Sequence, residues 1–247
     1  MSLCVALLAA ALAAPAEPAA EPFEALLSRA DALYARRDEP GARADLEKLL
    51  GEAARRAPAD YGVLWRRAQL QFWISDDPLL PAEEKSKLGQ ACWEVADEAA
   101  RAQPGKVEGW FYAAGCMGNY ALGIGVLKAL TQGIEGKFKE RLAKAEALDA
   151  AFQSGAIATA WGRFYYELPW PKYDAARSEQ RLRDALGRNP RNVRALVYLA
   201  ELFRKEGKPE EAGRLLESAV ARPPGAYDAP EERRWQARAR ALLAQKP

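Results

Sequence analysis

Apolar residues recur at three- and four-residue intervals along most of this chain, and that spacing predicts amphipathic helices. The first two runs consist of Phe23, Leu26, Leu27, Ala30, Leu33 and Tyr34 and of Leu46, Leu49 and Leu50. No alternating apolar and polar stretch of useful length predicts a strand, and no Asn-Gly or Asp-Gly pair marks a hairpin turn. The pattern therefore predicts an all-α protein.

Short polar segments containing Gly or Pro separate these helical runs. They lie at 38–41, 76–78, 103–105, 189–190 and 207–209. Because Pro interrupts a helix and Gly favours helix ends, each segment predicts a break between two helices. The chain should consequently fold as a series of helix pairs.

The clearest helix pair lies within 193–224. Its packing positions are Leu196, Leu199, Ala200 and Phe203 in the first helix and Ala212, Leu216 and Ala219 in the second. Gly207 ends the first helix, and Pro190 and Pro224 are 34 residues apart. This unit resembles a tetratricopeptide repeat, a pair of antiparallel helices with a period of about 34 residues.

Earlier units follow the same order with longer spacing. Their closing positions fall at Pro58, Pro104, Ala150 and Pro190, at intervals of 46, 46 and 40 residues. Residues 229–245 carry Trp235, Leu242 and Leu243 among polar residues and predict a terminal capping helix. We therefore predict an all-α, tetratricopeptide-like solenoid of four or five antiparallel helix pairs with a C-terminal capping helix.

The N-terminal segment has the length and composition of a secretory signal peptide. Residues 3–14 are apolar and rich in Ala and Leu, and no charged residue occurs before Glu17. Such a run is too short to span a bilayer. A basic residue before the run, which most signal peptides have, is missing. We expect a signal peptide at 1–14, a flexible Pro/Ala linker at 15–22, one repeat domain at 23–247, a periplasmic or secreted location and no transmembrane segment in the mature chain.

Composition argues against nucleic-acid binding and against catalysis. The chain has 36 Lys and Arg against 34 Asp and Glu, a net charge of +2, whereas a nucleic-acid protein normally has a clustered basic face. It contains no histidine, the commonest general base near neutral pH and the commonest zinc ligand. We predict that the protein is not an enzyme and has no metal or other cofactor.

Two cysteines, Cys92 and Cys116, lie at similar heights on neighbouring predicted helices, on either side of the break at 103–105. A disulfide is geometrically feasible in an oxidising compartment. Equal height does not ensure that the side chains face each other, so two separate buried thiols are the preferred interpretation and the disulfide is the alternative.

Within 118–212 the sequence contains GIG at 123–125, ALTQG at 129–133, EGKF at 135–138 and GRFYYELPWP at 162–171. This stretch resembles the T-component (TatT) family of tripartite ATP-independent periplasmic (TRAP) transporters. The resemblance implies a helical-repeat periplasmic protein that associates with a solute-binding protein and carries an apolar ligand in an internal cleft. Some family members are lipid-anchored, but Cys4 precedes the apolar run and is not a usable lipidation site. Ala150 also stands where the family pattern would place a proline after Asp149.

The first helix of each tetratricopeptide pair lines the concave face of the stack, which gives a set of candidate binding residues. They are Trp65, Gln69, Phe72, Phe111, Arg163, Tyr166, Val197, Glu201 and Arg204. Aromatic residues at helical spacing also occur in packed cores, which is the alternative for Trp65, Phe72 and Phe111. Arg163 either binds a carboxylate of a ligand or partner or forms an i,i+4 ion pair with Glu167.

Five glycines, Gly115, Gly118, Gly123, Gly125 and Gly133, are unusually dense for a helical region. They indicate either a close approach of helices or ligand, or a bent insertion.

Pro169 and Pro171 flank Trp170, which either plugs the space between helix ends or projects as an interaction anchor.

We therefore predict a periplasmic binding or adaptor protein that holds a small apolar or amphipathic ligand and docks a transport partner. The alternative is a scaffold whose concave groove binds a protein partner without a small ligand. A ligand carrier predicts a mostly apolar cavity near Phe111, Gly123 and Tyr166, whereas a scaffold predicts an open groove.

Overall fold

The computed structural model describes residues 21–225 and 228–245, and every regular element within them is helical. The elements are α1 (Phe23–Tyr34), α2 (Ala42–Arg56), α3 (Tyr61–Ser75), α4 (Ala82–Ala102), α5 (Val107–Ile124), α6 (Val126–Thr131), α7 (Ile134–Leu148), a 3-10 turn (Phe152–Ser154), α8 (Ala156–Glu167), α9 (Ala175–Arg188), α10 (Val193–Lys205), α11 (Pro209–Ala221) and α12 (Ala229–Ala244). The all-α prediction is confirmed. The expected signal peptide at 1–14 and most of the linker at 15–22 lie outside the described residues.

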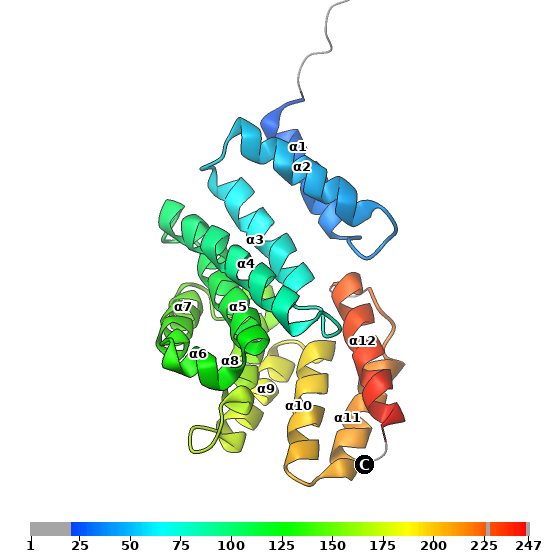
Figure 1. The fold of residues 1–247 in the computed structure, drawn as a ribbon. Coiled ribbons are helices and arrows are strands. Elements are labelled where there is room, and N and C mark those ends of the chain that lie inside the picture. The colour runs from blue at the N-terminus through cyan, green and yellow to red at the C-terminus, as the bar shows by residue number, and fades with distance from the viewer. Residues whose placement is uncertain (1–20, 226–227, 246–247) are drawn as a thin grey trace, which may run out of the picture.

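The helices form five antiparallel pairs that stack side by side, followed by the single helix α12 (Figure 1). The pairs are α1 with α2, α3 with α4, α5 with α7, α8 with α9 and α10 with α11. Helices α2, α4, α7 and α9 each end two residues before the closing position that the sequence predicts. The predicted solenoid with a C-terminal capping helix is therefore confirmed, with five pairs in the described chain.

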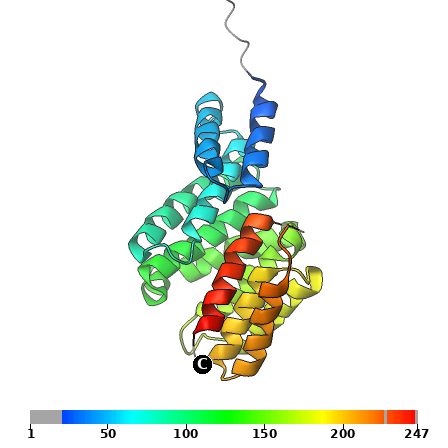
Figure 2. The ribbon, with the colours of Figure 1, turned by 90° about the vertical axis from the view of Figure 1, so that its right-hand side faces the viewer.

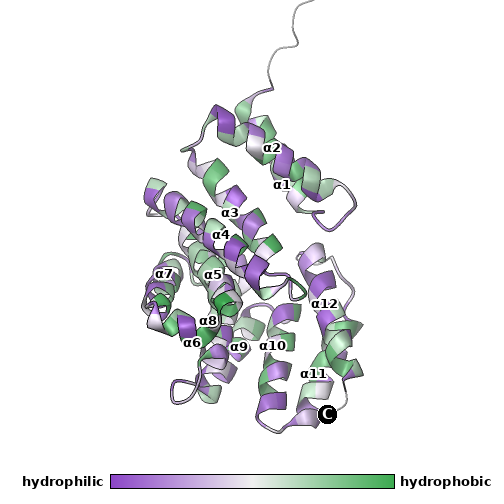
Figure 3. Cartoon of the chain, in the orientation of Figure 1, coloured by the Kyte–Doolittle hydropathy of each residue, from purple (hydrophilic) through white to green (hydrophobic). Residues whose placement is uncertain are grey.

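Side chains at the helix starts explain why several pairs begin where they do. The N-cap residues Asp60, Asp174, Asn192 and Asp228 each accept a hydrogen bond from the backbone N–H three residues ahead. These contacts satisfy N–H groups that have no partner within the helix. Along the helices, apolar and polar residues alternate between faces (Figure 3), so each helix buries one side against its neighbours.

The dense glycines have two separate structural roles. A Cβ atom at Gly89 would lie 2.6 Å from the backbone nitrogen of Tyr120, and one at Gly123 would lie 2.5 Å from that of Ser86, so α4 and α5 pack backbone to backbone. Gly125 and Gly133 instead have positive φ angles, 90° and 71°, at the two ends of the short helix α6. Both interpretations of the glycines therefore apply, close packing at Gly123 and an inserted bend at Gly125 and Gly133.

Helix α12 returns to the N-terminal end of the stack (Figures 1 and 2). Arg37, after α1, pairs with Asp228 at 2.8 Å, and Arg233 pairs with Asp38 at 2.6 Å. Arg234 of α12 also donates a hydrogen bond of 2.7 Å to the carbonyl of Trp73 in α3. The stack thus curls until its last helix contacts its first pairs, and the inner faces of the first helices surround an internal cavity.

Candidate functional site

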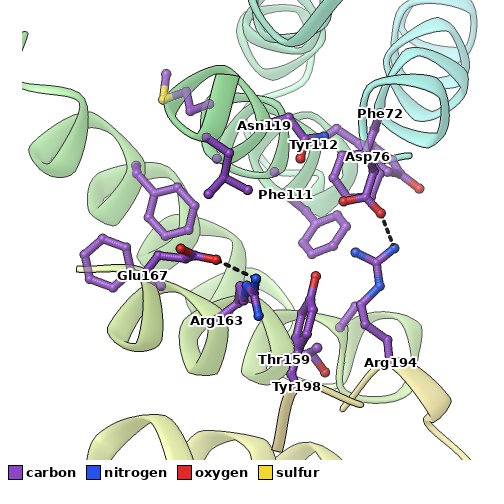
Figure 4. Close-up of a pocket in the computed structure, with 18 of the residues that line it drawn as sticks. Phe72, Asp76, Phe111, Tyr112, Asn119, Thr159, Arg163, Glu167, Arg194 and Tyr198 are labelled. Atoms are coloured by element: carbon purple, nitrogen blue, oxygen red, sulfur yellow. Dashed lines mark hydrogen bonds and ion pairs between the residues drawn. The ribbon is translucent and has the colours of Figure 1, made fainter. Parts of the chain in front are cut away.

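The cavity has a volume of about 220 Å³ and is lined by the first helices of all five pairs together with α6, α7 and α12 (Figure 4). Its apolar wall includes Phe72, Phe111, Met117, Leu122, Val126, Ala129, Leu130, Ile134, Phe138, Ala160 and Phe164. Its polar wall includes Asp76, Asn119, Thr159, Arg163, Glu167, Arg194, Tyr198 and Glu231. Apolar walls with a few fixed polar groups are typical of small-molecule sites.

Aromatic rings hold one another in place on the apolar wall. The rings of Phe72 and Phe111 meet edge to face with their centroids 6.3 Å apart. The rings of Phe138 and Phe164 are stacked, with centroids 4.9 Å apart. Such pairs add to the stability gained by burying the rings. The wall is therefore a preformed surface contributed by α3, α5, α7 and α8.

Arg194 forms two ion pairs on the polar wall. Its Nη2 lies 2.6 Å from Oδ2 of Asp76, and its Nε lies 2.5 Å from Oε1 of Glu231. Burial alone would lower the pKa of Arg194, but the two carboxylates outweigh burial and raise that pKa well above its usual range. Arg194 also lies 4.6 Å from the ring centroid of Trp235. Its guanidinium thereby ties together α3, α10 and α12.

Arg163 is also held by two carboxylates. Its Nη2 lies 2.6 Å from Glu167 Oε1, and its Nη1 lies 2.5 Å from Glu201 Oε2. The guanidinium lies between the rings of Tyr166 and Tyr198, 4.6 Å and 4.5 Å from their centroids. The structure thus contains the predicted i,i+4 ion pair with Glu167 and a second one with Glu201, which leaves Arg163 with its charge already compensated.

The hydroxyl of Tyr198 has no hydrogen-bond partner among the described residues. The side chain is buried, with 8% of the residue exposed, and its ring packs edge to face on Trp235 at 4.8 Å. Figure 4 shows the hydroxyl directed into the cavity between Arg163 and Arg194. Burial raises the pKa of this phenol, so the hydroxyl stays protonated at neutral pH. Tyr198 therefore offers the cavity one free hydrogen-bonding group.

Of the nine residues predicted to line the groove, Phe72, Phe111 and Arg163 line the cavity. Trp65 lies beneath Arg66, whose guanidinium is 4.3 Å from the indole centroid. Gln69 lies near the hydroxyl of Tyr112, which accepts a hydrogen bond from Gln153. These last two side chains belong to the inner face of α3 but are not part of the cavity lining.

The four predicted residues in the C-terminal part of the groove do not line the cavity. Val197 is completely buried in the hydrophobic core. Glu201 accepts hydrogen bonds from Arg163 and from Arg238 of α12, and Arg204 donates one of 2.7 Å to the carbonyl of Leu242. Tyr166 lies between Arg163 and Lys205, outside the cavity. The physical reason is that α12 covers this end of the concave face and pairs with its charges.

Sequence reasoning missed Asp76, Arg194 and Tyr198. Arg194 and Tyr198 are four residues apart on α10, a spacing that places both on one helix face. This spacing could have identified the face of α10 that lines the cavity. The predicted register assigned residues 197, 201 and 204 to that face instead, and these point toward the core and α12. Asp76 follows the end of α3 and gives no signal, because its partner is distant in sequence.

Cys92 of α4 and Cys116 of α5 form a disulfide in the structure, with Cα atoms 5.6 Å apart. The preferred expectation of separate thiols is thus corrected. The reason is the backbone-to-backbone packing of α4 and α5 at the glycines, which brings the two Cβ atoms together.

The interpretation of Trp170 as a plug is also wrong, since 88% of this residue is exposed.

No protein-family model and no curated protein sequence matches the chain. Among solved structures, it is similar to the crystal structure of a thermophilic tetratricopeptide-repeat protein from Thermus thermophilus. The TM-score is 0.68 at 17% sequence identity, and the match covers 91% of this chain and 100% of that one. This chain has a tetratricopeptide-like fold. At this identity the likeness concerns the fold alone.

Tetratricopeptide-like solenoids present extended concave surfaces and typically serve as non-catalytic scaffolds that bind proteins. No helix within 21–225 and 228–245 combines the length and apolar character needed to cross a membrane. The same residues contain no group of three or more Cys, Asp or Glu side chains arranged to hold a metal ion.

Proposed function

We propose that this protein is a non-enzymatic binding protein that holds a small apolar or amphipathic molecule in its internal cavity. We further propose that it acts in the periplasm or outside the cell as an adaptor for a transport partner. The cavity is the observation that carries the proposal, because the inner faces of all five pairs and α12 contribute a mostly apolar wall to one common site.

The part of the chain that resembles the T-component family supplies much of the cavity wall. Gly118, Ala129, Phe138 and Phe164 all line the cavity and lie within 118–212. In that family the internal cleft is thought to hold apolar ligand, and the same use of this wall is the simplest account of its apolar surface. The cavity therefore supports the ligand-carrier hypothesis more than the scaffold hypothesis.

Two features support a location outside the cytoplasm. Residues 3–14 have the composition of a signal-peptide core. The disulfide between Cys92 and Cys116 fits an oxidising compartment, because cytosolic thiols are kept reduced. The partner that the resemblance implies is a solute-binding protein. An adjacent gene for such a protein would supply the candidate, and sedimentation of the two purified proteins together would test whether they form a complex.

Native mass spectrometry of the full chain purified from its own host tests the ligand-carrier function. We expect a retained small molecule that leaves on denaturation. Gly118 lines the cavity, and a Cβ placed there meets only Phe138, at 3.7 Å, so Gly118→Leu should fill the cavity and abolish retention. Gly136→Leu is the matched control, since a Cβ at Gly136, also in a helix, meets nothing within 4 Å.

Retention by both variants would place the molecule elsewhere on the protein and contradict the proposal. A wild-type chain that folds, carries no molecule and binds the solute-binding protein tightly would instead support the scaffold alternative.

A further inference from the structure

We infer that the cavity selects a neutral ligand of about nine non-hydrogen atoms, with an apolar body and one hydrogen-bonding oxygen, such as a phenol, an alcohol or a ketone. This inference rests on the proposed function, because it specifies the ligand of the same cavity. Three observations carry it, namely the cavity volume, the compensation of charge on the polar wall and the unpaired hydroxyl of Tyr198.

The volume sets the size of the ligand. An apolar cavity of about 150 Å³ accommodates one benzene molecule. This cavity, at about 220 Å³, is roughly half as large again. It consequently has room for about nine non-hydrogen atoms, by proportion to benzene. A single ring with a short side chain fits this space.

Each buried arginine on the cavity wall already has a carboxylate partner. Arg163 is paired with Glu167 and Glu201, and Arg194 with Asp76 and Glu231. A ligand carboxylate would have to displace one of these carboxylates or lie beside it in a site with little water. Either outcome is unfavourable, because buried like charges repel strongly and a displaced carboxylate would lose its partner. This arrangement disfavours the capture of a carboxylate by Arg163.

A ligand with an ammonium group is also disfavoured, because the carboxylates of the cavity wall already have partners. Among the acidic residues on the cavity wall, Asp228 pairs with Arg37, Glu135 pairs with Lys172, and Glu232 accepts a hydrogen bond from the backbone N–H of Gly225. With Asp76, Glu167 and Glu231 paired as above, each of these carboxylates has a partner within the described chain. A buried ammonium ion would therefore lack a free counter-ion, and desolvation would oppose its binding.

Tyr198 is then a polar group available to the ligand. The residue is largely buried, and its hydroxyl points into the cavity and has no partner among the described residues, whereas Thr159 donates to the carbonyl of Gly155 and Asn119 donates to Ser75. A protonated phenol can both donate and accept a hydrogen bond. A ligand oxygen placed among Phe72, Phe111 and Tyr198 would satisfy it.

Isothermal titration calorimetry with four small probes tests this inference on the full chain, after retained molecules have been removed with a hydrophobic resin. The probes are 4-propylphenol, propylbenzene, 4-ethylbenzoate and phenethylammonium. We expect 4-propylphenol to bind most tightly, and Tyr198→Phe to weaken its binding about five-fold, the loss of one net hydrogen bond. Propylbenzene should bind the wild type and Tyr198→Phe equally.

Tyr173→Phe is the matched control, because the Tyr173 hydroxyl pairs with Glu206 outside the cavity, and it should bind all probes as the wild type does. Tighter binding of either charged probe, or equal binding of 4-propylphenol by wild type and Tyr198→Phe, would overturn the ligand class while leaving the carrier function intact. Binding of none of the four, together with no retained molecule in native mass spectra, would overturn both.

Discussion

Arg194 of α10 donates a hydrogen bond of 2.6 Å to Asp76, a residue 118 positions earlier in the chain. The same guanidinium reaches Glu231 of α12, so one side chain connects the second pair, the fifth pair and the capping helix. Neighbouring pairs in a simple solenoid contact only each other. This contact between distant pairs turns the stack into a closed curl with a cavity inside it.

Removing Arg194 should destabilise this closure strongly. Arg194→Met would leave Asp76 and Glu231 buried without their shared counter-ion, and loss of one partner of a buried pair costs about 3–5 kcal/mol. Urea denaturation followed by circular dichroism measures the change in the free energy of unfolding. Arg43→Met is the control, because the pair of Arg43 with Glu47 is exposed and worth at most about 0.5 kcal/mol. Equal stabilities of the two variants would contradict a structural role for Arg194.

Arg163→Ala should impair both stability and probe binding. The change leaves Glu167 and Glu201 facing each other and removes the cation that lies 4.5 Å from the ring of Tyr198. We expect a loss of about 3 kcal/mol in unfolding free energy and weaker binding of 4-propylphenol. Arg163→Lys should restore only part of this, because a single ammonium nitrogen lacks the two Nη atoms with which the guanidinium contacts Glu167 and Glu201 separately. If Arg163→Ala changes neither stability nor affinity, Arg163 is an ordinary surface residue.

Local physical rules allowed much of the fold to be predicted from the sequence. The 34-residue spacing from Pro190 to Pro224 and the apolar spacing of α10 and α11 gave the helix pairs, because helix periodicity and Pro and Gly breaks act over a few residues. The curvature of the stack, which brings α12 close to Arg37, is the sum of the small angles between successive helix pairs. Short sequence patterns do not determine that sum, so the contact between α12 and Arg37 could not be predicted.

This difference explains why only some of the predicted residues line the cavity. Phe72, Phe111 and Arg163 lie near the middle of the stack, where facing the concave side is enough to line the cavity. Glu201 and Arg204 also belong to a first helix, but α12 covers them, and its position follows from the closure. The residues that the prediction missed, such as Asp76, have partners distant in the sequence.

A glycine at the contact of α4 with α5 should be far more sensitive to substitution than a glycine on an exposed helix face. A Cβ at Gly89 would lie 2.6 Å from the backbone nitrogen of Tyr120, so Gly89→Ala must push the two helices apart, at a cost of about 1–3 kcal/mol. Gly136→Ala should instead stabilise the protein by about 0.5–1 kcal/mol, because alanine favours the helix and meets nothing. Thermal unfolding of both variants measures the difference, and a stable Gly89→Ala would contradict the close helix contact.

Acid should weaken the closure between α12 and the rest of the molecule. Burial raises the pKa of Glu231, but Arg194 outweighs it and holds that pKa below 4.5, while the hydrogen bond from Arg233 holds the pKa of Asp38 below 3.8. Because the unfolded state binds these protons first, their stabilisation is complete above the unfolded pKa values and is lost as pH falls through the folded ones. Burial raises the pKa of Asp76, so Asp76 has the opposite sign and offsets part of the loss.

We therefore expect the melting temperature to fall below about pH 4.5. Glu231→Gln should reduce that slope, and Glu47→Gln, at an exposed position of α2, should leave it unchanged. A slope that is identical in wild type and Glu231→Gln would exclude Glu231 from the acid response.

The disulfide should contribute to stability only under oxidising conditions. Cys92 and Cys116 are separated by 24 residues, and closing a loop of this length stabilises a fold by about 3 kcal/mol through the unfolded chain. Urea denaturation with and without dithiothreitol should show that difference in the wild type, and Cys92→Ser/Cys116→Ser should be insensitive to the reductant. Mass spectrometry after alkylation without reduction counts the free thiols directly. Modification of both cysteines in protein isolated from the periplasm would show that they remain separate thiols there, and the argument for an oxidising compartment would then rest on the N-terminal segment alone.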